Sequence, residues 1–200
     1  MSYVTGNRYL TQAEMTTNAK YIWNYLGSRG WSKNAVAGML GNMETESTIN
    51  PGIWEGLNAN EGPGFGLVQW TPYTKYTGWC ADRGLDPSAM DSALKRIEYE
   101  LDLGLQYYPT DAYPLTFKEF KVSTQTPEYL AQAFLLNYER PADSSQPNRS
   151  TQARAWYNVL EGDPVTPEEP EEPDTPSTPA PWPKFKPMST LLLVASRRRF

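Results

Sequence analysis

The chain has no histidine, and Cys80 is the single cysteine among its 200 residues. Without histidine, neither a Ser-His-Asp nor a Cys-His catalytic arrangement can form, and the usual zinc-hydrolase sites lose their imidazole ligands. A single cysteine also excludes a disulfide within the chain and any Cys-x-x-Cys redox or metal motif. We therefore expect no metal and no cofactor, and a chemistry that uses carboxylates, hydroxyls, amides, lysine or arginine.

Positive charge and long apolar runs are also scarce. The formal net charge is −5 and the pI is near 4.9, whereas a nucleic-acid-binding protein usually has a basic face. The longest apolar run, Leu191–Ala195, is far shorter than the roughly 20 residues that span a bilayer. The first ten residues lack the basic region and the apolar run of a signal peptide. The sequence thus predicts no nucleic-acid partner, no transmembrane segment and no signal peptide.

Proline is concentrated in one stretch. Nine of the 25 residues from Asp163 to Pro187 are proline, and six are acidic. Proline favours an extended backbone that cannot enter a helix, and few apolar side chains remain there to form a core. We therefore divide the chain into a compact domain over residues 1–162, a linker over 163–187, and a basic and apolar C-terminal tail over 188–200. The tail is either a docking peptide or a disordered end.

Helix signals dominate the first 162 residues. Thr11 and Glu14 have the spacing of a capping box, Thr126-Pro127 is a second helix start, and Gly104 is a helix terminator. With the apolar spacing, these signals predict helices over about 11–26, 32–50, 91–103, 126–138 and 149–160. Residues 52–80 are rich in glycine, proline and tryptophan without a helical stripe, which favours short strands and turns. The expected fold is mainly α with a small β- and loop-rich insertion.

One carboxyl near the end of the second predicted helix is a candidate for catalysis. At 100° per residue, Glu46 lies about 60° from the buried Met43, at the rim of the apolar stripe. A carboxyl there loses part of its hydration, which favours the protonated form that a general acid needs. Glu44 lies on the other flank, about 160° from Glu46, so the two cannot act as a pair. Position alone favours the alternative that Glu46 is a solvated acid near a helix end.

Two motifs, one around Glu46 and one about 20 residues later, together resemble the sequence pattern of a known enzyme superfamily. Glu46-Ser47 with Asn50-Pro51, followed by Gly66-Leu67-Val68-Gln69, resembles the Glu-Ser…Pro and Gly-Leu-x-Gln pair of the goose-type lysozyme and lytic transglycosylase superfamily. The closer resemblance is to phage tail-associated lysozymes, especially the lysozyme domain of the tail-tip wall-degrading protein of small short-tailed phages. Further matching stretches cover residues 34–43, 65–72 and 138–141, and the opening Tyr9-Leu10-Thr11 and the final Trp156-Tyr157 are similar too. The resemblance therefore extends over about residues 5–162.

The resemblance implies a lysozyme-like α+β fold in which the insertion lines a substrate cleft. It also implies peptidoglycan as substrate, with Glu46 as the catalytic acid that cleaves the β-1,4 bond between N-acetylmuramic acid and N-acetylglucosamine. The residues expected to bind the sugar chain are Ser47, Phe65, Gly66, Gln69, Trp70, Tyr138 and Glu139. Trp54 and Trp79 are further aromatic candidates for stacking on sugar rings, or for covering the core.

The sequence leaves the second catalytic group open. Glu55, Glu61 and Glu139 are candidates, and each could instead be a surface acid. The Ala-Tyr-Asn-x-Gly signature of transglycosylases is absent in that form, so hydrolysis and transglycosylation both remain open. The zinc endopeptidase that follows the lysozyme domain in the most similar proteins cannot be carried over to a chain without histidine.

The resemblance implies a virion protein that is made in the host cytoplasm and acts from the phage tail at the host cell wall. Its tail at 188–200 would then contact other phage tail proteins. Two alternatives stay open: a wall-binding or structural tail protein that has kept the fold without activity, and a cytosolic endolysin with no role in assembly.

Overall fold

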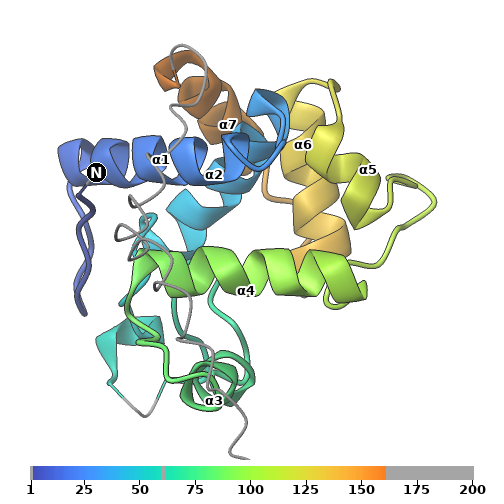
Figure 1. Cartoon of the computed structure of the whole chain (residues 1–200). Coiled ribbons are helices and arrows are strands. Elements are labelled where there is room, and N and C mark those ends of the chain that lie inside the picture. Colours follow the sequence, from blue (N-terminus) through green and yellow to red (C-terminus); the bar gives the residue numbers. More distant parts are fainter. Residues whose placement is uncertain (1, 60–61, 161–200) are drawn as a thin grey trace, which may run out of the picture. The chain divides into compact units, whose positions relative to one another are not determined.

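The computed structural model describes residues 2–59 and 62–160, and the described part is mainly helical (Figure 1). The predicted linker at 163–187, the tail at 188–200 and the domain boundary at 162 lie outside the described residues. The helical elements, in chain order, are α1 (Gln12–Gly27), α2 (Lys33–Ser47), η1 (Glu55–Leu57), α3 (Thr74–Ala81), α4 (Met90–Leu103), α5 (Phe117–Val122), α6 (Pro127–Phe134), η2 (Leu135–Glu139) and α7 (Asn148–Val159).

Local capping signals set several helix ends where the sequence predicts them. The Thr11 side chain accepts a hydrogen bond from the Glu14 amide while the Glu14 carboxylate accepts one from the Thr11 amide, which forms the predicted capping box of α1. Ser32 caps α2 through the Ala35 amide, and Thr126 caps α6 in front of Pro127. These contacts satisfy amides at helix starts that would otherwise lack partners.

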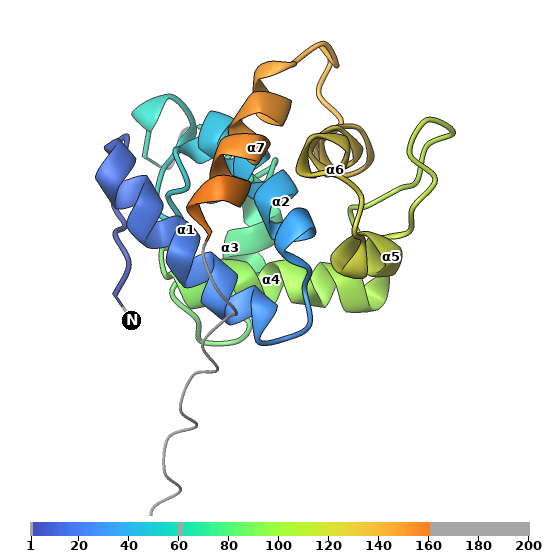
Figure 2. The same cartoon turned by 90° about the horizontal axis from the view of Figure 1, so that it is seen from above.

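Helix α2 lies at the centre of the described residues, against α1, α6 and α7 (Figure 2). Two glycines in α2 allow α6 and α7 to pack closely against this helix. A Cβ on Gly38 would lie 2.9 Å from the Leu130 backbone in α6, and one on Gly41 would lie 2.4 Å from the Arg149 carbonyl oxygen in α7. The helix is therefore buried over most of its length, and its last turn carries Glu46.

The predicted β-rich insertion differs from the structure. Among the described residues, β pairing is limited to three isolated bridges: Trp54 with Phe65, Phe65 with Trp70, and Thr110 with Tyr113. Residues 52–59 and 62–73 are mostly turns around η1. Helix α3 follows them, and its Tyr76 and Cys80, one turn apart, are both buried. The prediction of short strands is therefore wrong for the described residues, which form turns, η1 and α3 over this stretch.

The helix predicted over 126–138 changes geometry before its end. The regular part, α6, ends at Phe134, and η2 continues it as a π-helical turn over Leu135–Glu139. The Arg140 amide closes this turn by donating to the Leu135 carbonyl at 2.7 Å. Such turns carry an extra residue and are often found at functional sites. Here the turn presents Tyr138 and Glu139.

Candidate active site

A cavity of about 680 Å³ lies beside the last turn of α2. Its walls come from α2, the turn-rich segment after it, and the π-helical turn η2. Five of the eight predicted site residues line it: Glu46, Gln69, Trp70, Tyr138 and Glu139. The structure therefore brings together residues that are up to 93 positions apart in the sequence, from 46 to 139.

Glu46 is held by an arginine from α7. The Arg149 Nη2 donates to Glu46 Oε1 at 2.5 Å, and 22% of the Glu46 side chain is exposed against 4% of the Arg149 side chain. Arg149 is itself fixed, because its Nη1 donates to Asn42 Oδ1 at 3.0 Å and its Nε to Gln146 Oε1 at 2.7 Å. The guanidinium thus stabilises the negative charge of the Glu46 carboxylate and fixes its position.

Glu139 also lines the cavity, in very different surroundings. The side chain is half-buried, and its Oε1 is sealed from solvent without a hydrogen-bond partner among the described residues. Burial raises the pKa of Glu139 well above its usual range, and the negative charge of Glu46 raises it further. Arg149 and Arg140 act in the opposite direction, and their effect is smaller.

Tyr138 and Trp70 line the cavity side by side, and hydrogen bonds to Glu100 in α4 fix both side chains. The Trp70 Nε1 donates to Glu100 Oε1 and to the Tyr138 hydroxyl, both at 3.1 Å, and the Tyr138 hydroxyl donates to Glu100 Oε2. The Arg96 Nε donates to Glu100 Oε1 at 2.8 Å. Burial raises the pKa of Glu100, and the hydrogen bond from Tyr138 and the charge of Arg96 oppose this effect. Both aromatic side chains are therefore fixed by a buried carboxyl.

Gln69 lines the cavity with its backbone in the left-handed region, at φ 48°. Its Nε2 donates to the carbonyl oxygens of Gly66 at 2.9 Å and Ile53 at 3.3 Å, while its Oε1 has no partner among the described residues. The amide nitrogen therefore holds the loop together. The oxygen is sealed from solvent beside this loop.

Three of the predicted sugar-binding residues, Ser47, Phe65 and Gly66, are placed behind the cavity wall. The Ser47 hydroxyl donates to the Met43 carbonyl at 3.0 Å and the Leu67 carbonyl at 2.8 Å, which ties α2 to the loop. Phe65 is 4% exposed and packs against Trp54 and Tyr76. These side chains are buried because the loop folds back onto the core, so their contacts support the cavity.

Some of the other carboxyl and tryptophan candidates line the cavity, and others do not. Glu55 and Trp54 line the cavity, whereas Glu61 lies outside the described residues. Trp79 packs against Tyr76 and Tyr99 outside the cavity lining. Glu44 accepts a hydrogen bond from Trp156 Nε1 at 2.7 Å and does not line the cavity, as its predicted position on the helix implies.

Left-handed backbone is concentrated around the cavity. Gln69, Gln106 and Arg140 line it with φ between 48° and 65°, and Thr48 and Ile49 directly follow the last turn of α2 with φ of 53° and 55°. Positive φ is unfavourable for residues with a Cβ, most of all for the β-branched Thr48 and Ile49. Strained backbone of this kind is typical of functional sites, where the surrounding contacts hold it in place.

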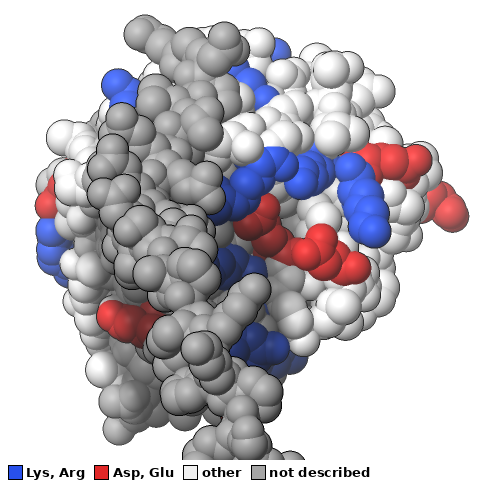
Figure 3. Space-filling view, viewed as in Figure 1, with Lys and Arg blue, Asp and Glu red and all other residues white. Residues whose placement is uncertain are grey.

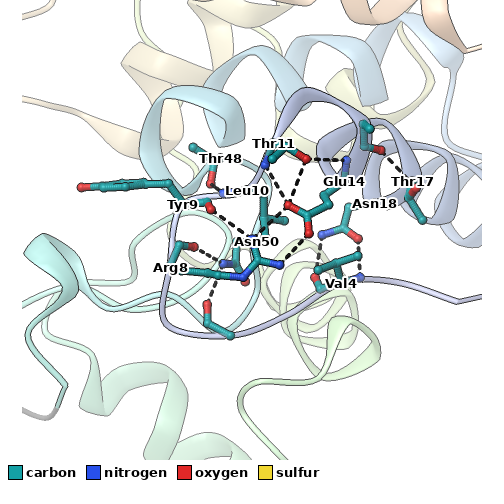
Figure 4. A network of polar contacts seen from close by, with 12 residues as sticks. Val4, Arg8, Tyr9, Leu10, Thr11, Glu14, Thr17, Asn18, Thr48 and Asn50 are labelled. Carbon is teal, nitrogen blue, oxygen red and sulfur yellow. Dashed lines mark hydrogen bonds and ion pairs between the residues drawn. The ribbon is translucent and has the colours of Figure 1, made fainter.

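The N-terminal segment before α1 completes the cavity with a residue that sequence reasoning missed. Tyr9 lines the cavity and is 61% exposed. Figure 4 shows the segment fixed to the turn after α2: the Leu10 amide donates to Thr48 Oγ1 at 2.9 Å, and the Asn50 Nδ2 donates to the Arg8 carbonyl at 2.7 Å. We call residues 4–11 the N-terminal strap. It places an aromatic ring at the rim of the cavity.

The face seen in Figure 3 carries basic and acidic side chains next to each other, so neither sign of charge dominates its visible described part. In the described part of the chain, no helix is long and apolar enough to cross a membrane.

The residues that the structure describes contain no group of three or more acidic, cysteine or histidine side chains that could hold a metal ion. Cys80 is buried.

Comparisons with known proteins show which family the chain resembles. A profile of the family described as phage tail lysozyme matches residues 17–160. Morphogenesis protein 1 of Bacillus phage B103 is 54% identical to the chain over 161 residues. The match covers 80% of this chain and 44% of that relative, so the chain spans less than half of the relative's length.

Proposed function

The chain belongs to the phage tail lysozyme family, and on this basis we propose that it degrades peptidoglycan by cleaving the β-1,4 bond between N-acetylmuramic acid and N-acetylglucosamine. Glu46 is the catalytic residue of this proposal. The main support for this proposal is that Glu46 lines one cavity together with a second carboxyl, an amide and three aromatic rings. These residues are Glu139, Gln69, Tyr9, Trp54 and Tyr138.

The composition of the cavity fits a sugar chain. Carboxyl groups supply the proton and the negative charge that glycosidic cleavage requires, because its transition state resembles an oxocarbenium ion. Aromatic side chains offer flat apolar faces, and Gln69 contributes an amide side chain to the lining. The exposed Tyr9 ring and the half-buried Trp54 ring are the surfaces on which sugar rings would stack.

We further propose that the protein is a virion component that opens the host wall locally from the phage tail. The support is the family, together with the relative whose name describes a role in morphogenesis. The basic and apolar tail at 188–200 is the proposed contact with other tail proteins. In a structural protein without activity, the half-buried Glu139 at the cavity would be costly, because one of its carboxyl oxygens is sealed from solvent without a hydrogen-bond donor among the described residues.

The test is the action of the purified chain on isolated peptidoglycan, with mass analysis of the soluble products. Cleavage should release disaccharide fragments, and the mass of their ends distinguishes hydrolysis from transglycosylation, because the anhydro end is lighter by one water. Glu46→Gln should abolish release, since removing an essential carboxyl costs several decades in rate. Glu44→Gln, on the same helix outside the cavity, is the matched control and should keep most of the activity. Full release by Glu46→Gln would refute the assignment.

A further inference from the structure

The N-terminal strap is fixed to the turn that follows α2. The Leu10 amide donates to Thr48 Oγ1 at 2.9 Å, and the Asn50 Nδ2 donates to the Arg8 carbonyl oxygen at 2.7 Å. Asn50 is fully buried, and Thr48 comes two residues after Glu46. The strap is therefore held by the stretch of chain that directly follows the proposed catalytic carboxyl (Figure 4).

A second buried asparagine anchors the start of the strap. The Asn18 Oδ1 accepts a hydrogen bond from the Val4 amide at 2.7 Å, and its Nδ2 donates to the carbonyl oxygens of Val4 and Ile49, both at 2.8 Å. Further along, the Asn7 Nδ2 donates to the Leu57 carbonyl oxygen at 3.0 Å. Contacts to α1, to the turn after α2 and to η1 thus fix a segment that is itself neither helix nor strand.

The Tyr9 ring takes no part in these contacts. The residues on both sides of Tyr9 are bound through their backbone, whereas its own hydroxyl has no hydrogen-bond partner in the described part of the chain. The side chain is 61% exposed, lines the cavity and points away from the network in Figure 4. An aromatic ring on a fixed backbone offers a flat apolar face that loses little conformational entropy when a ligand binds.

We propose that the strap builds an additional sugar subsite at the rim of the cavity, where Tyr9 stacks on a ring of the glycan strand away from the cleaved bond, so that the protein prefers long strands to short ones. This inference rests on the proposed function and adds the length of the strand to it. The family profile begins at residue 17, so the strap lies before the matched residues. The subsite is therefore proposed for this chain and not for its family.

The chemistry of the rim fits a sugar ring. A pyranose ring has an apolar face of C–H bonds and an edge of hydroxyl groups. Tyr9 offers a flat face with one hydroxyl, and the exposed Glu55 and the half-buried Trp54 line the same cavity. A purely apolar ligand would have to cover these polar groups without giving them partners, which is unfavourable.

The position of Tyr9 determines which kinetic constant it should affect. A ring that stacks away from the cleaved bond is bound equally well in the ground state and in the transition state. Such uniform binding lowers KM and leaves kcat unchanged. A strand too short to reach Tyr9 from the cleaved bond gains nothing from it. The subsite therefore has two signatures, an effect on KM and a dependence on strand length.

The experiment measures kcat and KM on soluble, uncrosslinked peptidoglycan strands that are separated by length. Tyr9→Ala should raise KM on long strands by about tenfold and keep kcat within about twofold. On the shortest strand that the unaltered chain cleaves, its kcat/KM should stay within about twofold. Tyr9→Phe keeps the ring and should match the unaltered chain. Leu103→Ala is the matched control, because Leu103 is 57% exposed and does not line the cavity, and it should change neither constant.

Several results would overturn the subsite while leaving the proposed function intact. These are an unchanged KM of Tyr9→Ala on long strands, a loss in kcat in place of KM, an equal loss on long and short strands, and a Tyr9→Phe variant as impaired as Tyr9→Ala. All variants should keep the unfolding midpoint of the unaltered chain, because exposed side chains contribute little to stability.

Binding measurements separate this inference from the proposed function. Glu46→Gln should bind long strands without cleaving them, and adding Tyr9→Ala to it should weaken this binding by about tenfold. If the unaltered chain fails to cleave any strand, the proposed function is refuted, and the binding comparison still decides the subsite. Weaker binding of the Tyr9→Ala form supports the subsite, whereas equal binding of the two forms, or no binding by either, would overturn it.

Discussion

Arg149 and Glu46 are 103 residues apart in the sequence, and the structure joins them by an ion pair of 2.5 Å at the wall of the cavity. The arginine is almost fully buried, and its remaining donors are bound to Asn42 and Gln146. The position of the proposed catalytic carboxyl therefore depends on the packing of α7 against α2. Four predictions follow from this pair and its surroundings.

Arg149→Gln should destabilise the protein by about 3 kcal/mol, because breaking a buried ion pair leaves an uncompensated charge. It should also reduce wall lysis by about 100-fold, because the Glu46 carboxyl loses its fixed position. Arg154→Gln is the matched control on α7: Arg154 pairs with Glu128 at 2.6 Å, and both side chains are more than a third exposed. That variant should change stability by less than about 1 kcal/mol. Equal stability of both variants in urea unfolding would contradict this account.

Gly41→Ala should destabilise the protein by roughly 2 kcal/mol or more, because overpacking forces backbone to move. The added Cβ would lie 2.4 Å from the Arg149 carbonyl oxygen and 2.8 Å from the Ala153 amide nitrogen, so α2 and α7 must separate. Gly78→Ala, in α3, meets open space and should stabilise by up to about 1 kcal/mol. Thermal or urea unfolding of the two variants tests the contrast, and two shifts of the same sign would contradict it.

The stability of the protein should depend on pH through Glu139. Because its pKa is raised on folding, the folded protein keeps this proton at pH values where the unfolded chain, with a pKa of roughly 4.3, has already released it. This contribution is therefore full below that pH and is lost as the pH rises through the folded pKa, with a slope of up to about 1.4 kcal/mol per pH unit.

Glu139→Gln cannot ionise and should remove most of this slope, so that the variant is more stable than the unaltered chain at high pH. A smaller slope of the same sign should remain, because burial also raises the pKa of Glu100. Urea unfolding between pH 5 and 9 provides the measurement. A constant difference in stability between the variant and the unaltered chain across that range would show that Glu139 does not titrate differently on folding.

Tyr138→Phe should destabilise the protein by about 1 to 3 kcal/mol, because it leaves a buried Glu100 oxygen without its donor. Tyr21→Phe is a milder change, since the Tyr21 hydroxyl donates to Asp91 at 2.6 Å in a partly buried position. Its expected cost is about 1 kcal/mol or less. Chemical unfolding of both variants compares the two, and a larger loss in Tyr21→Phe would contradict the proposed importance of the Glu100 network.

The sequence predicted those parts of the fold that local contacts decide. The capping box of Thr11 and Glu14 and the left-handed Gly104 after α4 depend only on neighbours along the chain. The same capping signal, in Thr116 and Glu119, starts the short helix α5, and sequence reasoning overlooked it because only one turn and a half of helix follows. Helix α3 was missed because its buried residues are embedded in a segment rich in glycine and tryptophan.

The candidate site was predicted less completely, because its geometry depends on contacts between distant segments. The motifs identified Glu46, Gln69 and Tyr138, which line the cavity. No local signal indicates Arg149, which reaches Glu46 only once α7 packs on α2, or Tyr9, which the N-terminal strap brings to the rim. The π-helical geometry at Glu139 likewise follows from tertiary packing and has no pattern in the sequence.

The burial of α2 has a consequence for how a substrate can be accommodated. Because this helix is enclosed by α1, α6 and α7, its amide hydrogens should exchange with deuterium only when the whole domain opens. The backbone that carries the Glu46 carboxyl therefore cannot shift toward a ligand by a local motion. A backbone adjustment to a substrate must then come from another part of the cavity lining, such as the turn-rich segment that carries the exposed Glu55.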